Sequence, residues 1–273
     1  MDLSVIIVNY HSRDKLANCL ASLARADMDN LRYEVIVVDN NSGEDLSGLG
    51  AAYPSWRFIM HDDNVGMGGG NNVGIRAATG EFVLILNPDT AIRGSAIPVL
   101  LNYLREHDRV GMVGPKLLYP DGSLQLSCAR FPSFFMPVLR RTFLGEYFKT
   151  SRDRFMMEEF DHQAIRPVDW VMGSCLLFRR RTLLADGSIF FPLFDERYFM
   201  YFEDIDLARQ FWTKGLQVVY NPEAVVIHDH QRDSARHPWY LAVFLDFLTW
   251  RHISSWLKYF SKWGLNNKNY AQD

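Results

Sequence analysis

The chain has 273 residues, of which 48% are hydrophobic and 22% are charged, and its formal net charge is -3. This balance is typical of a globular protein with one large domain or two small ones. The small negative charge gives no reason to expect nucleic-acid binding, and no membrane span is expected because no apolar run reaches about 18 residues.

The N-terminal sequence and the cysteines indicate a cytoplasmic protein. Residues 1–12 lack the basic leader and the long apolar core of a signal peptide. The 3 cysteines, Cys19, Cys128 and Cys175, are widely spaced and form no CxxC pair. We therefore expect buried free thiols in a reducing compartment, rather than a disulfide or a zinc site.

Residues 1–118 alternate between strand and helix patterns. Apolar, β-branched runs that are typical of buried strands occur at 3–9, 34–39, 56–61, 81–87 and 110–118. Helices are predicted at 12–26, at 94–107, and in a segment that follows a Gly- and Asn-rich loop at 64–74 and ends near Gly80. This alternation predicts a Rossmann-like α/β fold with a mostly parallel central sheet flanked by helices.

The second half of the chain is less regular. Residues 120–133 indicate a hairpin and loop, and the charged, aromatic residues 134–166 indicate a mobile excursion with weak periodicity. Further on we expect a strand at 168–181 broken at Gly173 and Ser174, a helix at 203–215 that ends at Gly215, a strand at 216–222 and the apolar run 224–230. Between Pro238 and residue 264, aromatic and apolar residues at helical spacing predict an amphipathic C-terminal helix.

Polar side chains follow three of the predicted strands where each strand ends. Asn9 follows the first, Asp39 the second and Asp89 the strand at 81–87. In doubly wound sheets, ligands bind at the carboxyl ends of the strands. Asp and Asn are also common turn residues, but three strands that end in this way favour a binding site at this edge.

The Gly-rich loop at 64–74 matches neither common phosphate-binding motif. Its sequence NVGMGGGNNVG does not contain GxGxxG and lacks the Lys-Ser/Thr of a P-loop. Two interpretations stay open. The glycines could allow the backbone to approach a ligand at the start of a helix, or the loop could be purely structural.

The segment 87-NPD-89 suits a hard cation. A Mg²⁺ or Mn²⁺ ion takes one or two carboxylates and completes its shell with substrate phosphates. Because Asp89 could not hold such an ion alone, this interpretation implies a substrate that carries a diphosphate.

Two further groups could carry chemistry. Glu203, Asp204 and Asp206 crowd the start of a helix, where acids either stabilise the helix dipole or, if one faces a substrate, act as a general base. His228 directly follows an apolar run and could complete a metal shell or contact a phosphate. His230 would point to the opposite face of a continuing strand, so we expect no zinc site.

Taken together, 37-VVDNNS-42, the NVGMGGGNNVG segment, 84-LILNPDT-90, 203-ED-204 and His228 resemble family 2 glycosyltransferases of the GT-A fold. The resemblance covers roughly residues 3–232 and is strongest to bacterial rhamnosyltransferases that build O-antigen or other surface polysaccharides. It implies a GT-A domain at 1–232, with a nucleotide-sugar half at 1–118 and an acceptor half at 119–232, followed by a helical, aromatic and basic extension at 233–273.

The resemblance also implies a role for each motif residue. Asp39 would read the pyrimidine base, and Asp204 would be the catalytic base. Asp89 and His228 would contact a Mg²⁺ or Mn²⁺ ion on the diphosphate. The remaining substrate-binding positions are Asn9, Tyr10, Asn64, Gly66, Asn72, Asn87 and Glu203. Asn87 stands where the family's DxD motif has its first Asp, so the free enzyme could hold metal weakly.

The implied activity is inverting transfer of a sugar, L-rhamnose from dTDP-rhamnose, to a hydroxyl of a lipid-linked saccharide. The C-terminal helix could pack on the core or on a partner subunit, or lie on the inner membrane leaflet together with the basic, aromatic region 130–154. Two alternatives stay open. A nucleotidyltransferase would carry a Gly-rich loop after the first strand, where this chain reads 9-NYHSRDK-15, and a non-catalytic nucleotide-sugar-binding protein would not need Asp204.

Overall fold

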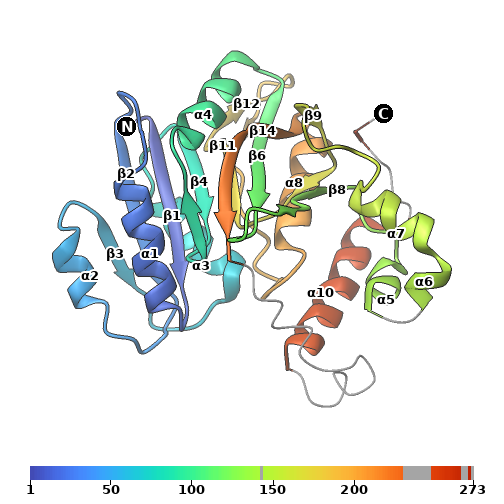
Figure 1. Ribbon diagram of the computed structural model, residues 1–273, viewed down its shortest axis with the longest axis horizontal. Helices are drawn as coiled ribbons and strands as arrows, with labels where there is room; N and C mark the ends of the chain where they lie inside the picture. Colours follow the sequence, from blue (N-terminus) through green and yellow to red (C-terminus); the bar gives the residue numbers. More distant parts are fainter. Residues whose placement is uncertain (142–143, 230–246, 266–269, 272–273) are drawn as a thin grey trace.

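The computed structural model describes residues 1–141, 144–229, 247–265 and 270–271. Its main sheet has the strand order β3-β2-β1-β4-β11-β6-β14-β5 (Figure 1). These strands are β1 (Leu3–Asn9), β2 (Tyr33–Asp39), β3 (Arg57–Met60), β4 (Phe82–Leu86), β5 (Thr90–Ile92), β6 (Val110–Leu118), β11 (Cys175–Arg179) and β14 (Gln217–His228). The short strands are β7 (Leu124–Gln125), β8 (Cys128–Ala129), β9 (Arg166–Pro167), β10 (Trp170–Val171), β12 (Thr182–Leu183) and β13 (Ile189–Phe190).

Helices cover both faces of the sheet. They are α1 (Arg13–Ala24), α2 (Ser47–Ala52), α3 (Gly66–Ala77), α4 (Ala96–Glu106), α5 (Met136–Arg141), α6 (Leu144–Tyr147), α7 (Lys149–Met156), α8 (Glu203–Thr213) and α10 (Phe247–Trp263). Successive side chains of β1 point to opposite faces, so Ile7 packs in the cluster that contains α1 and α4, and Ile6 in the cluster that contains α3 and α8. The predicted α/β fold class is confirmed.

The sheet is parallel from β3 to β4 and mixed beyond it. β1 pairs in parallel with β2 and β4, whereas β11 inserts antiparallel between β4 and β6. The break predicted at Gly173 and Ser174 is confirmed, because it separates β10 from β11. The two predicted runs 216–222 and 224–230 form one strand, β14, whose register shifts between Asn221 and Val225.

Three expectations differ from the structure. Residues 134–166, expected as an irregular excursion, contain α5, α6 and α7. Neither α2 nor β5 was predicted, because both are too short to show a periodic pattern. The Gly-rich segment is not a loop, since α3 begins at Gly66 and includes the glycine run.

The glycines of α3 allow close packing on two sides. A Cβ at Gly74 would lie 2.4 Å from Ile6 Cγ2, and one at Gly70 would lie 2.9 Å from Val8 Cγ1, so these positions let the helix lie directly on β1. Gly66 has φ +77°, and a Cβ there would lie 2.2 Å from the Phe199 carbonyl oxygen. The structure therefore gives the glycine run a packing function.

The described part of the C-terminal helix packs on the core. Tyr259 and Phe260 of α10 are buried, Lys262 Nζ donates to Asp206 Oδ2 at 2.8 Å, and Trp263 Nε1 donates to Asp206 Oδ1 at 2.6 Å. The predicted start at Pro238 lies outside the described residues, and the domain boundaries at 118 and 232 stay a prediction. Among the helices that the structure describes, none is long and apolar enough to cross a bilayer.

The three cysteines are free and buried, as predicted. Cys19 lies under the end of β4, where its thiol is 3.7 Å from Thr90 Oγ1. Burial raises the pKa of the Cys19 thiol to about 12, so this group stays protonated at physiological pH.

The packing of α3 can be tested with a pair of glycine variants. We expect Gly74→Ala to lower the free energy of unfolding by about 1–3 kcal/mol, because the new methyl group overlaps the Ile6 side chain. Gly48→Ala, in the exposed helix α2 with no atom within 4 Å of the new Cβ, should not lower it. Urea unfolding measures both, and equal stability of the two variants would contradict the packing argument.

Candidate active site

The carboxyl ends of β1 and β2 carry a connected set of polar side chains. Asn9 is opposite Asp39 in the parallel register, and the two are 0% and 2% exposed. Asn9 Nδ2 donates to Asp39 Oδ1 at 2.8 Å, and Ser42 Oγ donates to the same oxygen at 2.6 Å. These bonds fix the orientation of the Asp39 carboxylate at the sheet edge. Tyr10 follows directly and is 45% exposed.

Asn40 connects β2 to the start of α3, and the sequence analysis gave it no role of its own. Its Nδ2 donates to Asn64 Oδ1 at 2.9 Å and to the Gly66 carbonyl at 3.1 Å, and its Oδ1 accepts from the Val65 amide at 3.1 Å. The end of β2 is thereby tied to the turn that starts α3. An Asn directly after a strand is common in turns, so the local sequence carries no signal of these contacts.

Asn72 has a structural task in this fold. Its Nδ2 donates to the Phe194 carbonyl at 2.8 Å and to Glu196 Oε1 at 2.9 Å, while its Oδ1 accepts from the Phe194 amide at 2.9 Å. The side chain therefore holds the segment before α8 against α3. Its predicted role in lining a nucleotide and sugar pocket stays a prediction.

Asp89 and His228 lie side by side although 138 residues lie between them in the chain. β5 and β14 are antiparallel with Thr90 opposite His228, and the Asp229 amide donates to the Asp89 carbonyl at 2.9 Å. Asp89 Oδ1 then lies 3.3 Å from His228 Nε2. The sequence analysis predicted both residues as metal contacts, but β5, which brings them together, was not predicted.

The residues present fit a divalent cation. Asp89 Oδ1 is buried and faces His228 Nε2, and it has no well-aligned hydrogen-bond partner among the residues that the structure describes. Two neighbouring ligands of an octahedral ion, each about 2.1 Å from it, lie about 3.0 Å apart, close to the 3.3 Å between Asp89 Oδ1 and His228 Nε2. No group of three or more His, Cys, Asp or Glu side chains suited to a metal occurs in the described parts of the chain.

The charge of Asp89 is maintained at neutral pH. Burial alone would raise the pKa of this carboxyl group, but the adjacent His228 and the positive charge of Lys15 outweigh burial and hold its pKa below the usual value. Lys15 lies on α1 and was not among the predicted site residues. Its positive charge acts on the Asp89 carboxylate.

Asp204, the predicted base, is held by backbone groups. Its Oδ2 accepts from the Gly173 amide at 3.0 Å and its Oδ1 from the Ile205 amide at 2.8 Å. A Cβ at Gly173 would lie 3.1 Å from Asp204 Cβ, so the glycine permits this close approach. The next residue of the same turn, Ser174, accepts at its carbonyl from the Asn87 amide at 2.8 Å. The turn therefore joins the Asp204 region to the 87-NPD-89 segment.

Glu203 and Asp204 are adjacent carboxyl groups whose pKa values are both raised. Burial and the charge of Asp204 raise the pKa of Glu203 to about 8, and Glu203 Oε2 has no hydrogen-bond partner among the described residues. Burial also raises the pKa of Asp204, while the amides of Gly173 and Ile205 oppose that increase. We infer that Asp204 carries the negative charge at neutral pH and that Glu203 holds the proton.

Strand order and hydrogen bonds place these groups along one edge of the sheet, where β1, β4, β6 and β14 end (Figure 1). The residues that they bring to this edge are Asn9, Asp39, Asn64, Asn87, Asp89, Asp204 and His228. Their individual roles stay predictions.

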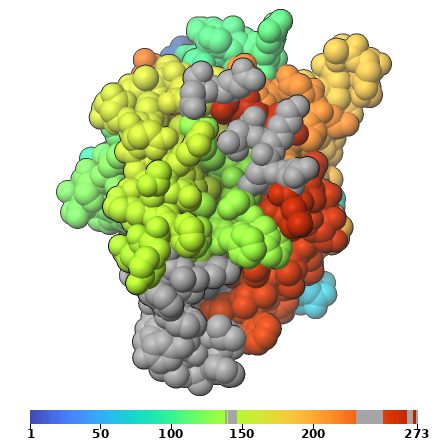
Figure 2. Space-filling view, turned by 90° about the vertical axis from the view of Figure 1, so that its right-hand side faces the viewer, coloured from blue at the N-terminus to red at the C-terminus, as the bar shows by residue number. Residues whose placement is uncertain are grey.

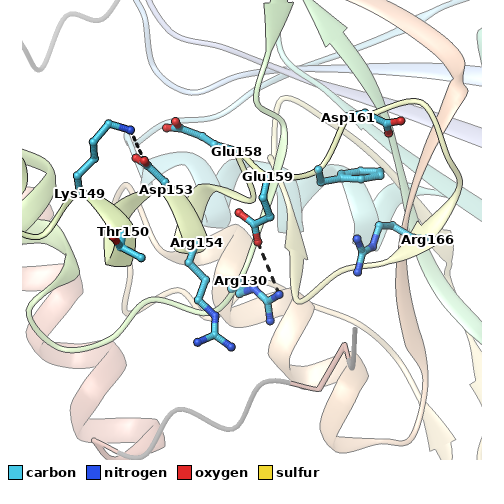
Figure 3. Close-up of a pocket in the computed structure, with 10 residues that line it drawn as sticks. Arg130, Lys149, Thr150, Asp153, Arg154, Glu158, Glu159, Asp161 and Arg166 are labelled. Carbon is cyan, nitrogen blue, oxygen red and sulfur yellow. Dashed lines mark hydrogen bonds and ion pairs between the residues drawn. The ribbon is translucent and has the colours of Figure 1, made fainter.

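A separate pocket of about 970 Å³ lies between α7 and the segment 158–166, and Figure 3 shows the charged side chains around it. Both acidic and basic side chains line it. Lys149 is bonded to Asp153, and Arg130 lies 3.9 Å from Glu159. None of the predicted site residues lines this pocket. Because its charges are balanced, it offers no concentrated charge for a diphosphate.

The comparisons with known proteins agree with the resemblance seen in the sequence. Residues 4–181 match the family model described as glycosyl transferase family 2. The chain is 32% identical over 251 residues to an N-acetylglucosaminyl-diphospho-decaprenol L-rhamnosyltransferase of Mycobacterium tuberculosis, which covers 86% of this chain and 78% of the relative. It is 26% identical over 274 residues to the rhamnosyltransferase WbbL of Escherichia coli, with 97% and 96% covered.

Solved structures show the same fold at low sequence identity. The mannosyltransferase PcManGT of Pyrobaculum calidifontis, in complex with GDP-Man and Mn²⁺, matches 98% of this chain with a TM-score of 0.60 at 18% identity. TarS of Staphylococcus aureus matches 84% with a TM-score of 0.59 at 19% identity. The chain spans 65% and 60% of the lengths of these two proteins. With the family model and the relatives in agreement, the chain belongs to glycosyl transferase family 2.

Proposed function

We propose that this glycosyltransferase is metal-dependent and inverting, and that it transfers L-rhamnose from dTDP-rhamnose to a hydroxyl of a lipid-linked saccharide. One observation carries the chemical part of the proposal. The Gly173–Ser174 turn bonds both to Asp204 and to the strand end that leads to Asp89. A proton acceptor and a group suited to a diphosphate-bound cation are thus connected through a single turn.

The choice of donor follows from the relatives and from Asp39. Two relatives are named rhamnosyltransferases. Asp39 is held at the sheet edge by Asn9 and Ser42, with its Oδ2 receiving one further bond from the Ser42 amide at 3.0 Å. A carboxylate fixed in this way can accept a hydrogen bond from the ring N–H of a pyrimidine base such as the thymine of dTDP.

The side chains at the site can support a single displacement. Asp204 accepts the proton of the acceptor hydroxyl, and the oxygen attacks the anomeric carbon from the face opposite the diphosphate. Asp89 and His228 would hold a Mg²⁺ or Mn²⁺ ion, which when bound stabilises the charge on the leaving diphosphate. Lys15 adds a positive charge near Asp89. One base and one leaving-group site suffice for inversion.

The acceptor is proposed to approach from a membrane surface. The M. tuberculosis relative is named for a diphospho-decaprenol acceptor. In this chain α10 lies beside the segment that leads into α5, where Phe134 and Trp256 have ring centroids 4.7 Å apart, and Figure 2 shows α10 and the α5–α7 region on one face. Exposed apolar side chains on these elements are Phe135, Tyr147, Phe148, Trp250 and Leu257. Such residues beside Lys and Arg are typical of an interfacial surface.

A donor screen tests the proposed activity. Purified protein should release nucleoside diphosphate from dTDP-rhamnose in the presence of a lipid-diphosphate-linked saccharide and Mg²⁺ or Mn²⁺, and chelation of the ion should abolish release. UDP- and GDP-linked sugars serve as comparisons. A clear preference for one of these would overturn the choice of donor, and release that survives chelation would overturn the metal dependence.

A substitution at Asp204 tests the base. We expect Asp204→Asn to reduce transfer by about 10²–10⁴-fold while donor binding is retained, because the amide cannot accept the acceptor proton. Glu203→Gln should cause a smaller loss, since this side chain is neutral in the native protein. Asp108→Asn, at a fully exposed carboxylate, serves as the control and should be as active as the native protein. A non-catalytic binding protein would show no transfer in any variant.

The raised pKa of Asp204 predicts the acid side of the pH profile. A general base works only when ionised, so kcat/KM should fall as the pH decreases through the pKa of Asp204. Because that pKa is raised, the fall should occur above about pH 4, where an ordinary aspartate would still be ionised. Circular dichroism at each pH separates this loss from unfolding, and a rate that stays constant down to pH 4 would contradict the assignment.

A further inference from the structure

Gln125 lies beside the candidate metal pair, and none of the roles described so far includes it. β7 pairs antiparallel with the end of β6, where Leu117 is opposite Gln125, and β6 pairs with β14, where Leu118 is opposite Ile227. These two pairings bring Gln125 next to His228, and its side chain is only 3% exposed.

The contact between Gln125 and His228 has a defined direction. His228 Nδ1 and Gln125 Oε1 are 2.7 Å apart. An amide oxygen can only accept a hydrogen bond, so the imidazole must donate from Nδ1. With Nδ1–H held by Gln125, the Nε2 that faces Asp89 Oδ1 at 3.3 Å carries a hydrogen in the imidazolium and a lone pair in the neutral ring, which is the form that binds an ion. Partners of this kind orient metal-bound histidines and increase their basicity.

We propose that Gln125 is a positioning residue of the metal centre, because its amide oxygen holds His228 by Nδ1–H and directs Nε2 to the ion shared with Asp89. The inference rests on the metal-dependent function proposed above. It extends the site to β7, in the half of the chain where the sequence showed only a hairpin and loop.

If the Gln125 side-chain amide were rotated by half a turn, the direction of its hydrogen bond to His228 would be reversed. If Gln125 Nε2 donated to His228 Nδ1, the ring hydrogen would sit on Nε2 and occupy the position that the ion requires. An ionised glutamate at position 125 can only accept, so it imposes the orientation proposed here. Gln125→Glu and Gln125→Leu therefore separate a role of the amide oxygen from a role in packing.

Binding of Mn²⁺ to the full-length protein with dTDP present, followed by the electron paramagnetic resonance signal of free Mn²⁺, tests the proposal. We expect Gln125→Leu to weaken Mn²⁺ binding by about 10–100-fold, and Gln125→Glu to bind at least as tightly as the native protein. The control Gln163→Leu, at an exposed glutamine, should not change binding. Thermal melting shows whether each variant is folded. If Gln125→Leu does not fold, Mn²⁺ binding by Gln125→Glu alone tests the role of the amide oxygen.

The outcomes distinguish the two proposals. Native-like Mn²⁺ binding by Gln125→Leu, or loss of binding in a folded Gln125→Glu, would overturn the role of Gln125. If His228→Ala binds Mn²⁺ as the native protein does, the metal site itself is wrongly placed. Absence of Mn²⁺ binding by the native protein would overturn both.

Discussion

Two backbone groups of one turn connect two parts of the candidate active site. The Gly173 amide donates to Asp204, and the Ser174 carbonyl accepts from Asn87, so the start of α8 and the end of β4 have a common support. The turn exists because β11 enters the sheet antiparallel beside β4, directly after β10. A Cβ at position 173 would lie 3.1 Å from Asp204 Cβ, so a side chain there would crowd Asp204.

The C-terminal helix stabilises the same region from the other side. Asp206 is fully buried one turn into α8 and accepts hydrogen bonds from Lys262 and Trp263 of α10. A buried carboxylate is stable only when such partners compensate for its lost hydration. The neighbouring acids at 203–206 therefore have different surroundings. Asp204 lies at the sheet edge, whereas Asp206 contacts α10. The sequence showed three adjacent acids and no difference between them.

The two proposed parts of the metal site depend on strand pairing. Asp89 follows β4 and was visible as a carboxylate at the end of a buried run, and His228 was visible after an apolar run. Their 3.3 Å approach requires β5, whose three residues pair with β14. Gln125 reaches His228 through β7, which has only two residues. Strands of this length have no periodicity that a sequence could reveal.

The α/β class, the long strands, the principal helices and the family could be predicted from the amino-acid sequence, because buried runs, helical spacing and ordered motifs are local properties. It also indicated Asn9, Asp39 and Asp89, since polar residues at the ends of parallel strands converge on one edge. Asp204 was indicated by its place at the acidic start of a helix, and His228 by its place after an apolar run. The contacts of Asn40, Asn72 and Gln125, and the packing of the α3 glycine run on β1, became visible only in the folded chain. Those contacts join residues far apart in the chain, and an amide or a glycine has the same local signal whether it faces a ligand or a neighbouring strand.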